Sequence, residues 1–394
     1  PIRRVLSLST LYPNASNPRF GTFVARSMEA LAARGDWDVT MVNPIGMPPL
    51  AFGRYRDLAA AAKDGEDGGV HIHRPTFPLI PRFGVRHNPA IIARKVLPLV
   101  RRLHRDAPFD LVDAQFFYPD GPAALHIANA LGLPCSIKTR GSDITFWRTK
   151  GFARRQICDA AVGAAGLLGV SEALIDDMVA LGMPRAKIRL HRTGLDRDRF
   201  RPLDHTGLRT TLARRLDIAL PADAPLFSCV GALIERKGQA LAIEALTSFP
   251  DARLLLIGSG PDEALLKALV RRSGLTERVH FLGSVDHDVL PVILSASDAM
   301  VLPSSREGLA NAWVEALACG TPIVVNDAGG ARELVVSDTA GRIVARTPPA
   351  IAEGLQNVLA MNVAPEDVAA TVDAFSWSNN AGELAAHYES LLVR

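Results

Sequence analysis

The 394-residue sequence predicts an α/β protein with two doubly wound domains, each built on a parallel sheet. Short apolar runs that fit buried strands alternate with segments of helical periodicity, and this alternation is typical of parallel sheets. The alternation occurs twice, with a break near residues 200–224. Glycines follow several of the predicted strands, at the sheet edge where open α/β proteins bind ligands.

The composition is that of an ordinary globular protein, with 48% hydrophobic and 22% charged residues. It excludes disordered and collagen-like chains. No apolar run approaches the roughly 18 residues of a membrane span, and the first residues read as a strand rather than a signal peptide. The four cysteines (Cys135, Cys158, Cys229 and Cys319) form no CxxC pair. We expect them to be free thiols in a reducing cytoplasm.

The formal charge is unevenly distributed along the chain. Residues 1–201 carry 29 Lys and Arg against 18 Asp and Glu, whereas the remainder carries 15 against 23. A basic half favours an anionic partner, which could be nucleic acid, a phosphorylated substrate or an anionic lipid surface. A solvated basic surface is the alternative.

In the first half, residues 3–10 fit a strand, a loop rich in Pro, Asn and Gly follows, and a helix is predicted over 21–34. Gly21 would let the backbone approach a substrate, although plain turn geometry also explains a glycine there. Ser171 is placed to cap a helix over 172–181. Another helix is expected near 121–131, and further strands at 39–42, 70–74, 111–114, 136–139, 167–170 and 187–191.

Residues 89–105 predict a basic amphipathic helix with a kink at Pro98. Its basic residues are Arg94, Lys95, Arg101, Arg102 and Arg105. Such a helix can lie on a membrane surface, or it can pack on the core with a solvated basic face. The preceding residues, Arg82 to Arg86, favour contact with a membrane or a lipid phosphate.

The second half repeats the alternation. Strands are predicted at 226–230, 253–257, 279–281, 299–302 and 322–325, with helices at 239–246, up to 272 and from 286. A last helix near 380–392 has no partner that the sequence identifies.

Glycines at three strand ends of this half would form one edge with free backbone amides, suited to a phosphate-bearing ligand. They are Gly231, the pair Gly258 and Gly260, and the pair Gly329 and Gly330. Arg236 and Lys237, after the first of these strands, could neutralise a diphosphate. An exposed polar turn is the alternative.

Glu307 and Glu315 lie eight residues apart, on either side of a helix expected to open on Gly308, Leu309 and Ala310. The free amides and the dipole of a helix start favour an anion. Two helical turns would separate the glutamates, so one could bind a sugar and the other a ribose diol. Because its neighbours are apolar, Glu315 should need a polar partner.

The spacing Glu307-x7-Glu315, with GLANAWVEALACGTPIVV and GGARE, resembles the signature of retaining glycosyltransferase family 4. VGALIERKG at 230–238, the hinge-like TGLDRDRFRP at 193–202 and the loop NPRFGTFV at 17–24 are similar to the same family. The resemblance implies the GT-B fold, in which two Rossmann-like domains face a cleft. It implies an acceptor-binding domain over 1–200, a nucleotide-sugar domain over 201–375, and a C-terminal helix, 376–394, that crosses back to the first domain.

The resemblance also implies residue roles. Arg236 and Lys237 would hold the diphosphate, and Glu315 would bind the ribose. Glu307 and the amides after it would hold the transferred sugar and its phosphate. The donor-side residues are Gly231, Gly258, Gly308, Leu309, Ala310 and Glu315, and the acceptor-side residues are Gly21, Arg140 and Asp143. Three positions depart from the family pattern: Ala232 replaces an arginine, Arg140 a histidine and Thr193 an asparagine.

The predicted activity is transfer of a sugar, with retention, from a UDP- or GDP-sugar to a glycan or lipid-linked acceptor in cell-surface polysaccharide or glycolipid synthesis. The expected location is the cytoplasm, at the inner face of the plasma membrane. No DxD motif stands in a metal-binding context, since Asp196-Arg-Asp198 lies in the hinge-like segment. The prediction is therefore a metal-independent enzyme without a cofactor.

Other functions remain open at this point. They are a GT-B sugar-nucleotide epimerase or phosphorylase, an anionic-polymer-binding protein, and an inactive partner subunit. Nucleic acid is not expected as a partner, because the sequence has no stacking platform, helix-turn-helix or RRM signature.

Overall fold

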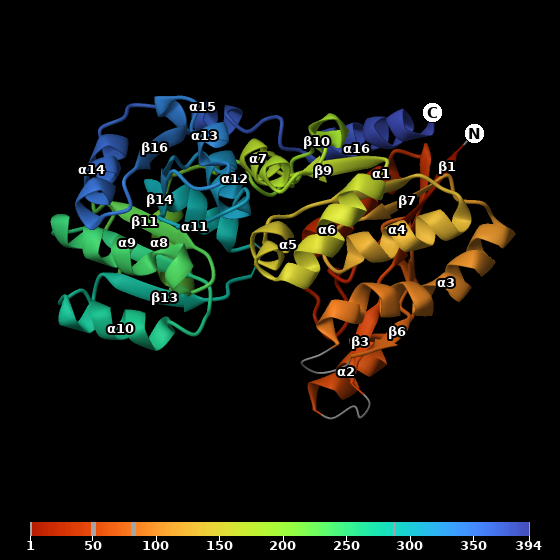
Figure 1. The fold of residues 1–394 in the computed structure, drawn as a ribbon. Coiled ribbons are helices and arrows are strands. Elements are labelled where there is room, and N and C mark those ends of the chain that lie inside the picture. Colours follow the sequence, from red (N-terminus) through yellow and green to blue (C-terminus); the bar gives the residue numbers. More distant parts are fainter. Residues whose placement is uncertain (1, 49–52, 80–83, 287, 394) are drawn as a thin grey trace. The chain divides into compact units, whose positions relative to one another are not determined.

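The computed structural model describes residues 2–48, 53–79, 84–286 and 288–393 (Figure 1). The chain forms two compact units. The first comprises Pro1–Gly194 and Trp377–Arg394, and the second comprises Leu195–Ser376. Each unit is a parallel sheet covered by helices, so the predicted α/β class with two doubly wound sheets is confirmed.

The first unit contains an eight-stranded sheet in the order β10-β9-β8-β7-β1-β2-β5-β4. Its strands pair in parallel except for β4, which is antiparallel to β5, and β3 and β6 form a separate parallel pair. The strands are β1 (Arg3–Leu8), β2 (Trp37–Val42), β3 (Ile45–Met47), β4 (Gly65–Asp67), β5 (Val70–His73), β6 (Thr76–Pro78), β7 (Leu111–Ala114), β8 (Cys135–Lys138), β9 (Gly166–Gly169) and β10 (Ile188–Leu190).

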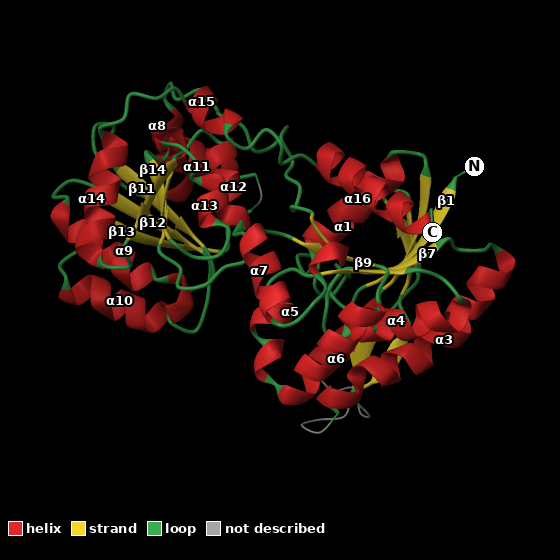
Figure 2. Ribbon diagram, turned by 45° about the horizontal axis from the view of Figure 1, so that its top comes forward, coloured by secondary structure: helices red, strands yellow, loops and turns green. Residues whose placement is uncertain are grey.

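Helices cover both faces of this sheet, with α1 and α16 on one side and α3, α4 and α6 on the other (Figure 2). The helices of the first unit are α1 (Thr22–Ala33), α2 (Arg54–Ala61), α3 (Asn88–Asp106), α4 (Asp120–Leu131), α5 (Ser142–Thr145), α6 (Gly151–Gly163), α7 (Glu172–Ala180) and α16 (Trp377–Leu392). Ser171 caps α7 by accepting a hydrogen bond from the Leu174 amide, as predicted.

The last helix, α16, packs within the first unit. It packs against α1, and the ring of Tyr388 meets the edge of Trp37 at a centroid distance of 5.3 Å. Both rings are buried. The helix begins at Trp377, earlier than the predicted residue 380.

The second unit contains a six-stranded sheet, entirely parallel, in the order β13-β12-β11-β14-β15-β16. Its strands are β11 (Leu226–Val230), β12 (Arg253–Ile257), β13 (Val279–Gly283), β14 (Ala299–Leu302), β15 (Ile323–Asn326) and β16 (Gly341–Val344). Its helices are α8 (Leu208–Leu216), α9 (Gln239–Ala245), α10 (Glu263–Arg272), α11 (Leu290–Ala296), α12 (Asn311–Ala318), α13 (Ala331–Leu334), α14 (Pro348–Leu359) and α15 (Pro365–Ala370).

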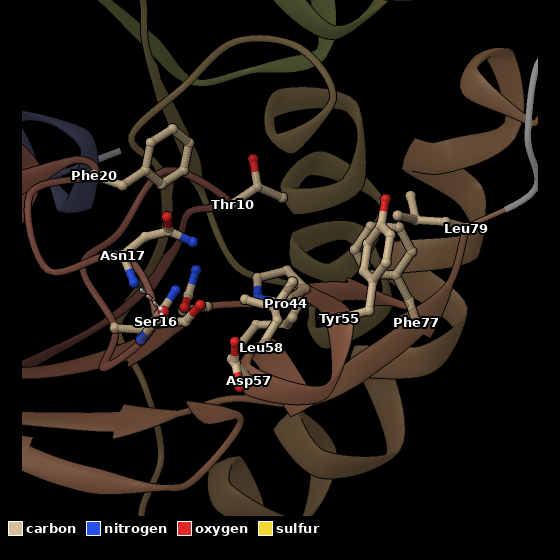
Figure 3. A pocket seen from close by; sticks show the side chains of 14 residues that line it. Thr10, Ser16, Asn17, Phe20, Pro44, Tyr55, Asp57, Leu58, Phe77 and Leu79 are labelled. Atoms are coloured by element: carbon tan, nitrogen blue, oxygen red, sulfur yellow. Dashed lines mark hydrogen bonds between the residues drawn. The ribbon is translucent and has the colours of Figure 1, made fainter. Parts of the chain in front are cut away.

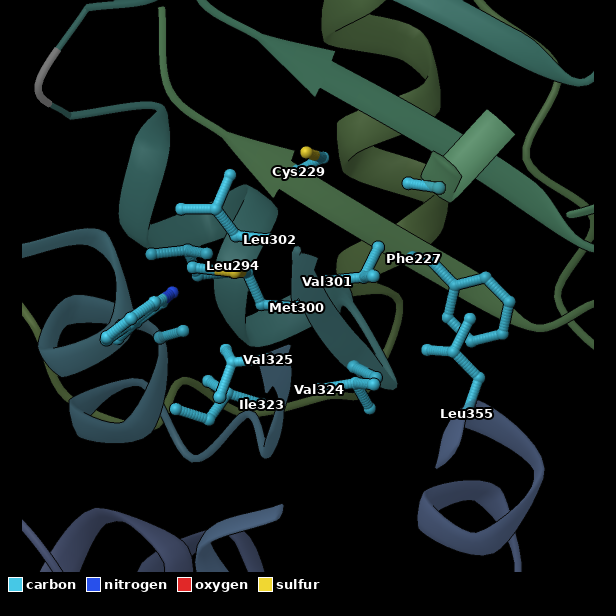
Figure 4. Close-up of a cluster of buried hydrophobic side chains, with 14 of the residues drawn as sticks. Phe227, Cys229, Leu294, Met300, Val301, Leu302, Ile323, Val324, Val325 and Leu355 are labelled. Atoms are coloured by element: carbon cyan, nitrogen blue, oxygen red, sulfur yellow. The ribbon is translucent and has the colours of Figure 1, made fainter. Parts of the chain in front are cut away.

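Most residues of the central strands are apolar and buried, and Figure 4 shows side chains of β11, β14 and β15 in one hydrophobic cluster. Burial on both faces is the reason that these strands read as nearly continuous apolar runs. Since β14 lies between β11 and β15, the loops that follow these three strands meet at one edge of the sheet. That edge carries the candidate site.

Residues 200–224, expected to separate the domains, instead contain α8, which belongs to the second unit. Arg209 of α8 forms an ion pair of 2.7 Å with Asp298, immediately before β14. The division between the units falls earlier, between Gly194 and Leu195.

The basic helix is α3, with Pro98 inside it. Ile92, Val96 and Val100 are buried, whereas its five predicted basic residues are exposed. Arg82 and Phe83 lie outside the described residues. No helix in the described ranges is long and apolar enough to cross a membrane. Contact of α3 with a membrane surface stays a prediction.

Candidate active site

Two cations and a carboxylate meet at the edge of the second sheet. Lys237 ends a short 3₁₀ turn after β11, Glu235–Lys237, and Glu307 lies in the loop after β14. The Lys237 Nζ is 2.5 Å from Glu307 Oε1, and both side chains are largely buried, with exposed fractions of 14% and 9%. Arg236 lies 3.6 Å from the other carboxylate oxygen and is more exposed. The strand order therefore brings together three predicted site residues.

Backbone contacts fix the two loops against each other. The Ser305 amide donates to the Arg236 carbonyl at 2.8 Å, and the Arg236 guanidinium donates to the Arg306 carbonyl at 2.5 Å. Arg346 donates to the carbonyls of Pro303 and Glu235 at 2.9 and 3.2 Å. These hydrogen bonds fix the loop that carries Arg236 and Lys237 against the loop that carries Glu307.

The loop after β15 supports Glu307 from another side. The Gly330 amide donates to the Gly308 carbonyl at 2.7 Å. Gly329 has φ of 54°, and a Cβ at this position would collide with the backbone carbonyls of Glu307 and Gly308. Only glycine combines this conformation with this close approach.

The helix after Glu307 starts later than predicted. Ala310 is extended, with φ of −70° and ψ of 119°, and α12 begins at Asn311. The prediction that the helix opens on Gly308 is therefore wrong, and Glu315 lies in the second turn of α12 rather than two turns from Glu307. No described residue accepts a hydrogen bond from the amides of Gly308, Leu309 and Ala310. Free amides are present here, as predicted, but they belong to a loop that leads into a helix.

Glu315 is half-buried, and it has no hydrogen-bond or ion-pair partner among the described residues. Burial raises the pKa of its carboxyl from the usual 4.5 to about 7. The partner that we expected from its apolar neighbours is absent from the described chain. A ligand that donates hydrogen bonds would favour the charged form of this carboxyl.

The glycines at the ends of β11 and β12 do not provide the free backbone amides that the sequence predicts. The Gly231 amide donates to the Ile257 carbonyl at 2.9 Å, and the Gly258 amide donates to the Gly283 carbonyl at 2.8 Å. These two amides are engaged in the sheet and are not free for a phosphate. A Cβ on Gly258 would collide with the Gly231 carbonyl, so packing of the two loops explains that glycine.

In the first unit, Arg140 follows β8 and is held by Gln115. Its Nη2 donates to Gln115 Oε1 at 2.5 Å, its Nε donates to the Gln115 carbonyl at 3.2 Å, and its guanidinium lies 5.0 Å from the centroid of the Phe23 ring. Burial lowers the pKa of Arg140 to about 10. Its Nη1 is buried and has no hydrogen-bond partner among the described residues, so part of the donor capacity of this predicted acceptor-side cation is unused.

Asp143 is fully buried and serves its own loop. Its oxygens accept hydrogen bonds from the Thr139 hydroxyl and from the amides of Phe117, Arg140 and Gly141, at 2.8 to 3.1 Å. In this structure Asp143 shapes the acceptor-side loop and offers no exposed surface to a ligand. Gly21 caps α1, and a Cβ there would lie 2.6 Å from the Leu11 carbonyl, so loop packing accounts for it without a ligand.

Sequence reasoning missed a buried polar row between β8, the end of β10 and α16. The Lys138 Nζ is 2.8 Å from His191 Nδ1, and His191 Nε2 donates to the Asn380 carbonyl at 2.9 Å. Burial, followed by the nearby charge of Arg140, lowers the pKa of Lys138. A lysine inside a predicted buried strand was the available signal. Its partners, far along the chain, were not visible in the sequence.

All four cysteines are free, as predicted. Among the described residues there is no group of three or more His, Cys, Asp or Glu side chains that could hold a metal ion.

Comparison with known proteins agrees with the fold. The family model for glycosyl transferases group 1 matches residues 214–372, and the model for a glycosyl transferase 4-like domain matches residues 20–194. A Bacillus subtilis protein named as a teichuronic acid biosynthesis glycosyltransferase is 27% identical over 405 residues, which cover 98% of each chain.

Two solved structures show the same architecture. Sucrose-phosphate synthase from Thermosynechococcus elongatus aligns with a TM-score of 0.77 at 21% identity, over 99% of this chain and 100% of that one. Anabaena HepE in complex with UDP-glucose aligns with a TM-score of 0.68 at 19% identity, over 98% and 99% of the two chains. The two doubly wound units thus form the GT-B fold, as predicted. With both family models matched, the chain belongs to the family 4 type of glycosyltransferases.

Proposed function

We propose that this glycosyltransferase takes a sugar from a UDP-sugar and transfers it, with retention, to a glycan or lipid-linked acceptor in cell-surface polysaccharide synthesis. The Bacillus relative, which matches nearly the whole chain, supports the polysaccharide assignment. The UDP-glucose complex of a protein with the same fold supports the nucleotide. A GDP-sugar is the alternative nucleotide that the experiment below tests.

The observation that carries the proposal is the cluster of Lys237, Arg236 and Glu307 beside the free amides. In this structure, Glu307 neutralises Lys237. A diphosphate would compete for Lys237 and Arg236, since charge-assisted hydrogen bonds to phosphate are strong. Glu307 would then accept hydrogen bonds from hydroxyls of the transferred sugar.

The remaining groups complete a donor site. The amides of Gly308, Leu309 and Ala310 would donate to a phosphate oxygen. Glu315 would bind the ribose diol as a carboxylate, and hydrogen bonds from the hydroxyls would lower its raised pKa.

Catalysis in this proposal consists of positioning the acceptor and stabilising the departing diphosphate. Lys237 and Arg236 provide the positive charge, and we propose that the reaction needs no metal ion. Activity after EDTA treatment should equal activity with added Mg²⁺. A loss that Mg²⁺ restores would contradict metal independence while leaving the donor site intact.

The test of the donor is a thermal-shift panel of UDP-glucose, UDP-N-acetylglucosamine and GDP-mannose. A ligand at 100 times its Kd stabilises the fold by about 2.7 kcal/mol. We expect UDP-sugars to raise Tm in the native chain and in Lys267→Ala, an exposed lysine on α10, but much less in Lys237→Ala. NMR of the anomeric proton of the product then tests retention. Equal shifts in both variants would contradict the proposal, and a response to GDP-mannose alone would overturn the choice of UDP.

A further inference from the structure

The first unit contains a pocket of about 540 Å³ that none of the predicted site residues lines. Pockets that bind small molecules have volumes of about 300–1,000 Å³. This one lies among the loops after β1 and β2, helix α2, and the pair β3 and β6 (Figure 3). Its lining residues are Thr10, Asn14, Ser16, Asn17, Phe20, Asn43, Pro44, Ile45, Gly46, Tyr55, Asp57, Leu58, Phe77 and Leu79.

One wall is a turn rich in amides and hydroxyls. The Asn14 side chain accepts hydrogen bonds from the amides of Ser16 and Asn17, both at 3.0 Å, and this fixes the turn. The Ser16 hydroxyl and the Asn17 carboxamide have no hydrogen-bond partner among the described residues. The turn is therefore ordered by Asn14, while its other two side chains keep their polar groups available.

One lining residue, Asn43, carries a buried acceptor that has no partner among the described residues. Asn43 is 2% exposed, its amide donates to the His73 carbonyl, and its Nδ2 donates to the Ser9 carbonyl at 2.8 Å. Its Oδ1 is buried with no partner in the described chain. A buried carbonyl oxygen that lacks a hydrogen bond is costly.

The opposite wall is apolar and aromatic. Figure 3 shows Tyr55, Phe77 and Leu79 across from Ser16 and Asn17, with Phe20 at another side of the pocket. Phe77 is buried, whereas Phe20 is 51% exposed, a high value for a phenylalanine. Sugar rings present C–H groups on their faces and hydroxyls at their edges, so a pocket with one aromatic and one amide wall complements such a ring.

The charge of the pocket selects among acceptors. Among the described residues that line the pocket, Asp57 carries the one charged side chain, and none of them is Lys, Arg or His. A phosphate or carboxylate entering here would meet no cation among the described lining residues and would face the Asp57 carboxylate. The pocket thus differs in charge from the basic surface of α3.

We propose that this pocket binds an uncharged, polyhydroxylated ring of the acceptor, a hexose or a cyclitol, between the turn at Asn14 to Asn17 and the side chains of Tyr55 and Phe77. The inference rests on the proposed function, since it names the acceptor that receives the sugar. It specifies that the ring of the acceptor bound here is uncharged, and it places any anionic group of the acceptor outside the pocket.

The test is saturation-transfer NMR with methyl α-D-glucopyranoside, myo-inositol and myo-inositol 1-phosphate, in the presence of UDP. Neutral rings should bind, and phosphorylated inositol should bind more weakly than inositol. A variant that loses about 1.4 kcal/mol of binding free energy binds the ring with a tenfold higher Kd. We expect at least this effect in Asn17→Ala and Tyr55→Ala, and none in Asn129→Ala, an exposed position on α4.

The outcomes separate the two proposals. The inference is overturned if the pocket variants bind neutral rings as the native chain does, or if the phosphorylated ring binds more tightly. The thermal shift with UDP-glucose, measured on the same variants, shows that they are folded. If UDP-glucose shifts Tm but the neutral rings do not bind, the proposed donor site stands and the proposal of an acceptor-ring pocket is overturned. If UDP-sugars give no shift in the native chain, the proposed function itself fails.

Discussion

Replacement of Lys237 tests the donor site most directly. Lys237→Ala removes the cation that lies 2.5 Å from Glu307 and leaves this carboxylate, which is 9% exposed, with Arg236 at 3.6 Å. Two effects follow. The free chain loses a charge-assisted contact, and the bound diphosphate loses a partner.

The two effects differ in size. Loss of a hydrogen bond to a charged group costs the fold about 1.5–3 kcal/mol, and Arg236 offsets part of it by moving toward Glu307. Loss of a group that stabilises charge in the transition state costs about 2.7–4 kcal/mol, or 10²–10³ in rate. The variant should therefore stay folded with a lower Tm, while kcat/KM falls at least a hundredfold.

The assay measures UDP release from a UDP-sugar with membrane extract as the source of acceptor, together with Tm. Lys237→Arg keeps the charge and should retain more activity than Lys237→Ala. Lys267→Ala removes an exposed lysine whose pair with Glu263 is worth about 0.2–0.5 kcal/mol, and it should behave as the native chain. Turnover of folded Lys237→Ala close to the native rate would refute the diphosphate role.

Three further predictions concern a carboxyl, a glycine and a surface. Because the pKa of Glu315 is raised from 4.5 to about 7, ionisation of this carboxyl opposes folding increasingly between these two pH values and fully above pH 7. Glu315→Gln should then raise Tm relative to the native chain at pH 8 but not at pH 4, and it should weaken UDP-sugar binding at pH 8. Gly329→Ala should destabilise the second unit by more than about 1 kcal/mol in urea unfolding, because the new Cβ would collide with backbone. Reversal of two exposed charges on α3, Arg94→Glu with Arg101→Glu, should reduce sedimentation with vesicles containing phosphatidylserine, since each basic residue contributes about 1 kcal/mol at such a surface.

Each of these has a control or a contrary result. A Glu315→Gln chain with unchanged UDP-sugar binding would remove the ribose role. Gly274→Ala also places alanine at positive φ, 67°, but its Cβ has no neighbour within 4 Å, so it should cost less than Gly329→Ala. Vesicle binding of the α3 variant equal to that of the native chain, at low salt, would show that the basic face is simply solvated.

The parts of the fold that sequence predicts are those with a strong apolar period. The central strands β11, β14 and β15 are buried on both faces, so nearly all of their residues are apolar, with Ser228 and Asn326 as the exceptions. Strand β16 was missed because it is short, lies at the sheet edge and begins with Gly341 and Arg342. Helix α14 was not predicted. It opens on Pro348 and Pro349, which fit its first turn, because proline is common at the start of a helix.

The candidate site, like the fold, was predicted only in part from the sequence. The residues that share the sheet edge, Lys237 and Glu307, follow strands whose order in a doubly wound sheet makes the encounter expected. The exact state of each backbone amide did not follow, because it depends on neighbouring loops. The amides of Gly231 and Gly258 donate hydrogen bonds to adjacent strands. Helix α12 starts after an extended Ala310, and no capping side chain marks this start in the sequence.

The polar row under α16 and the acceptor pocket were beyond sequence reasoning for another reason. The contact between His191 and Asn380 joins segments 189 residues apart. The pocket depends on the pair β3 and β6, whose three-residue strands carry too little pattern to be recognised.

The return of α16 to the first unit has a consequence for synthesis of the protein. The second unit is one continuous segment and can collapse as soon as it leaves the ribosome. The first unit is interrupted by it, and the apolar surface around Trp37 stays open until residues 377–392 emerge. The domain that starts first is therefore completed last, and a chain cut before Trp377 would carry an exposed hydrophobic face, a target for chaperones and proteases.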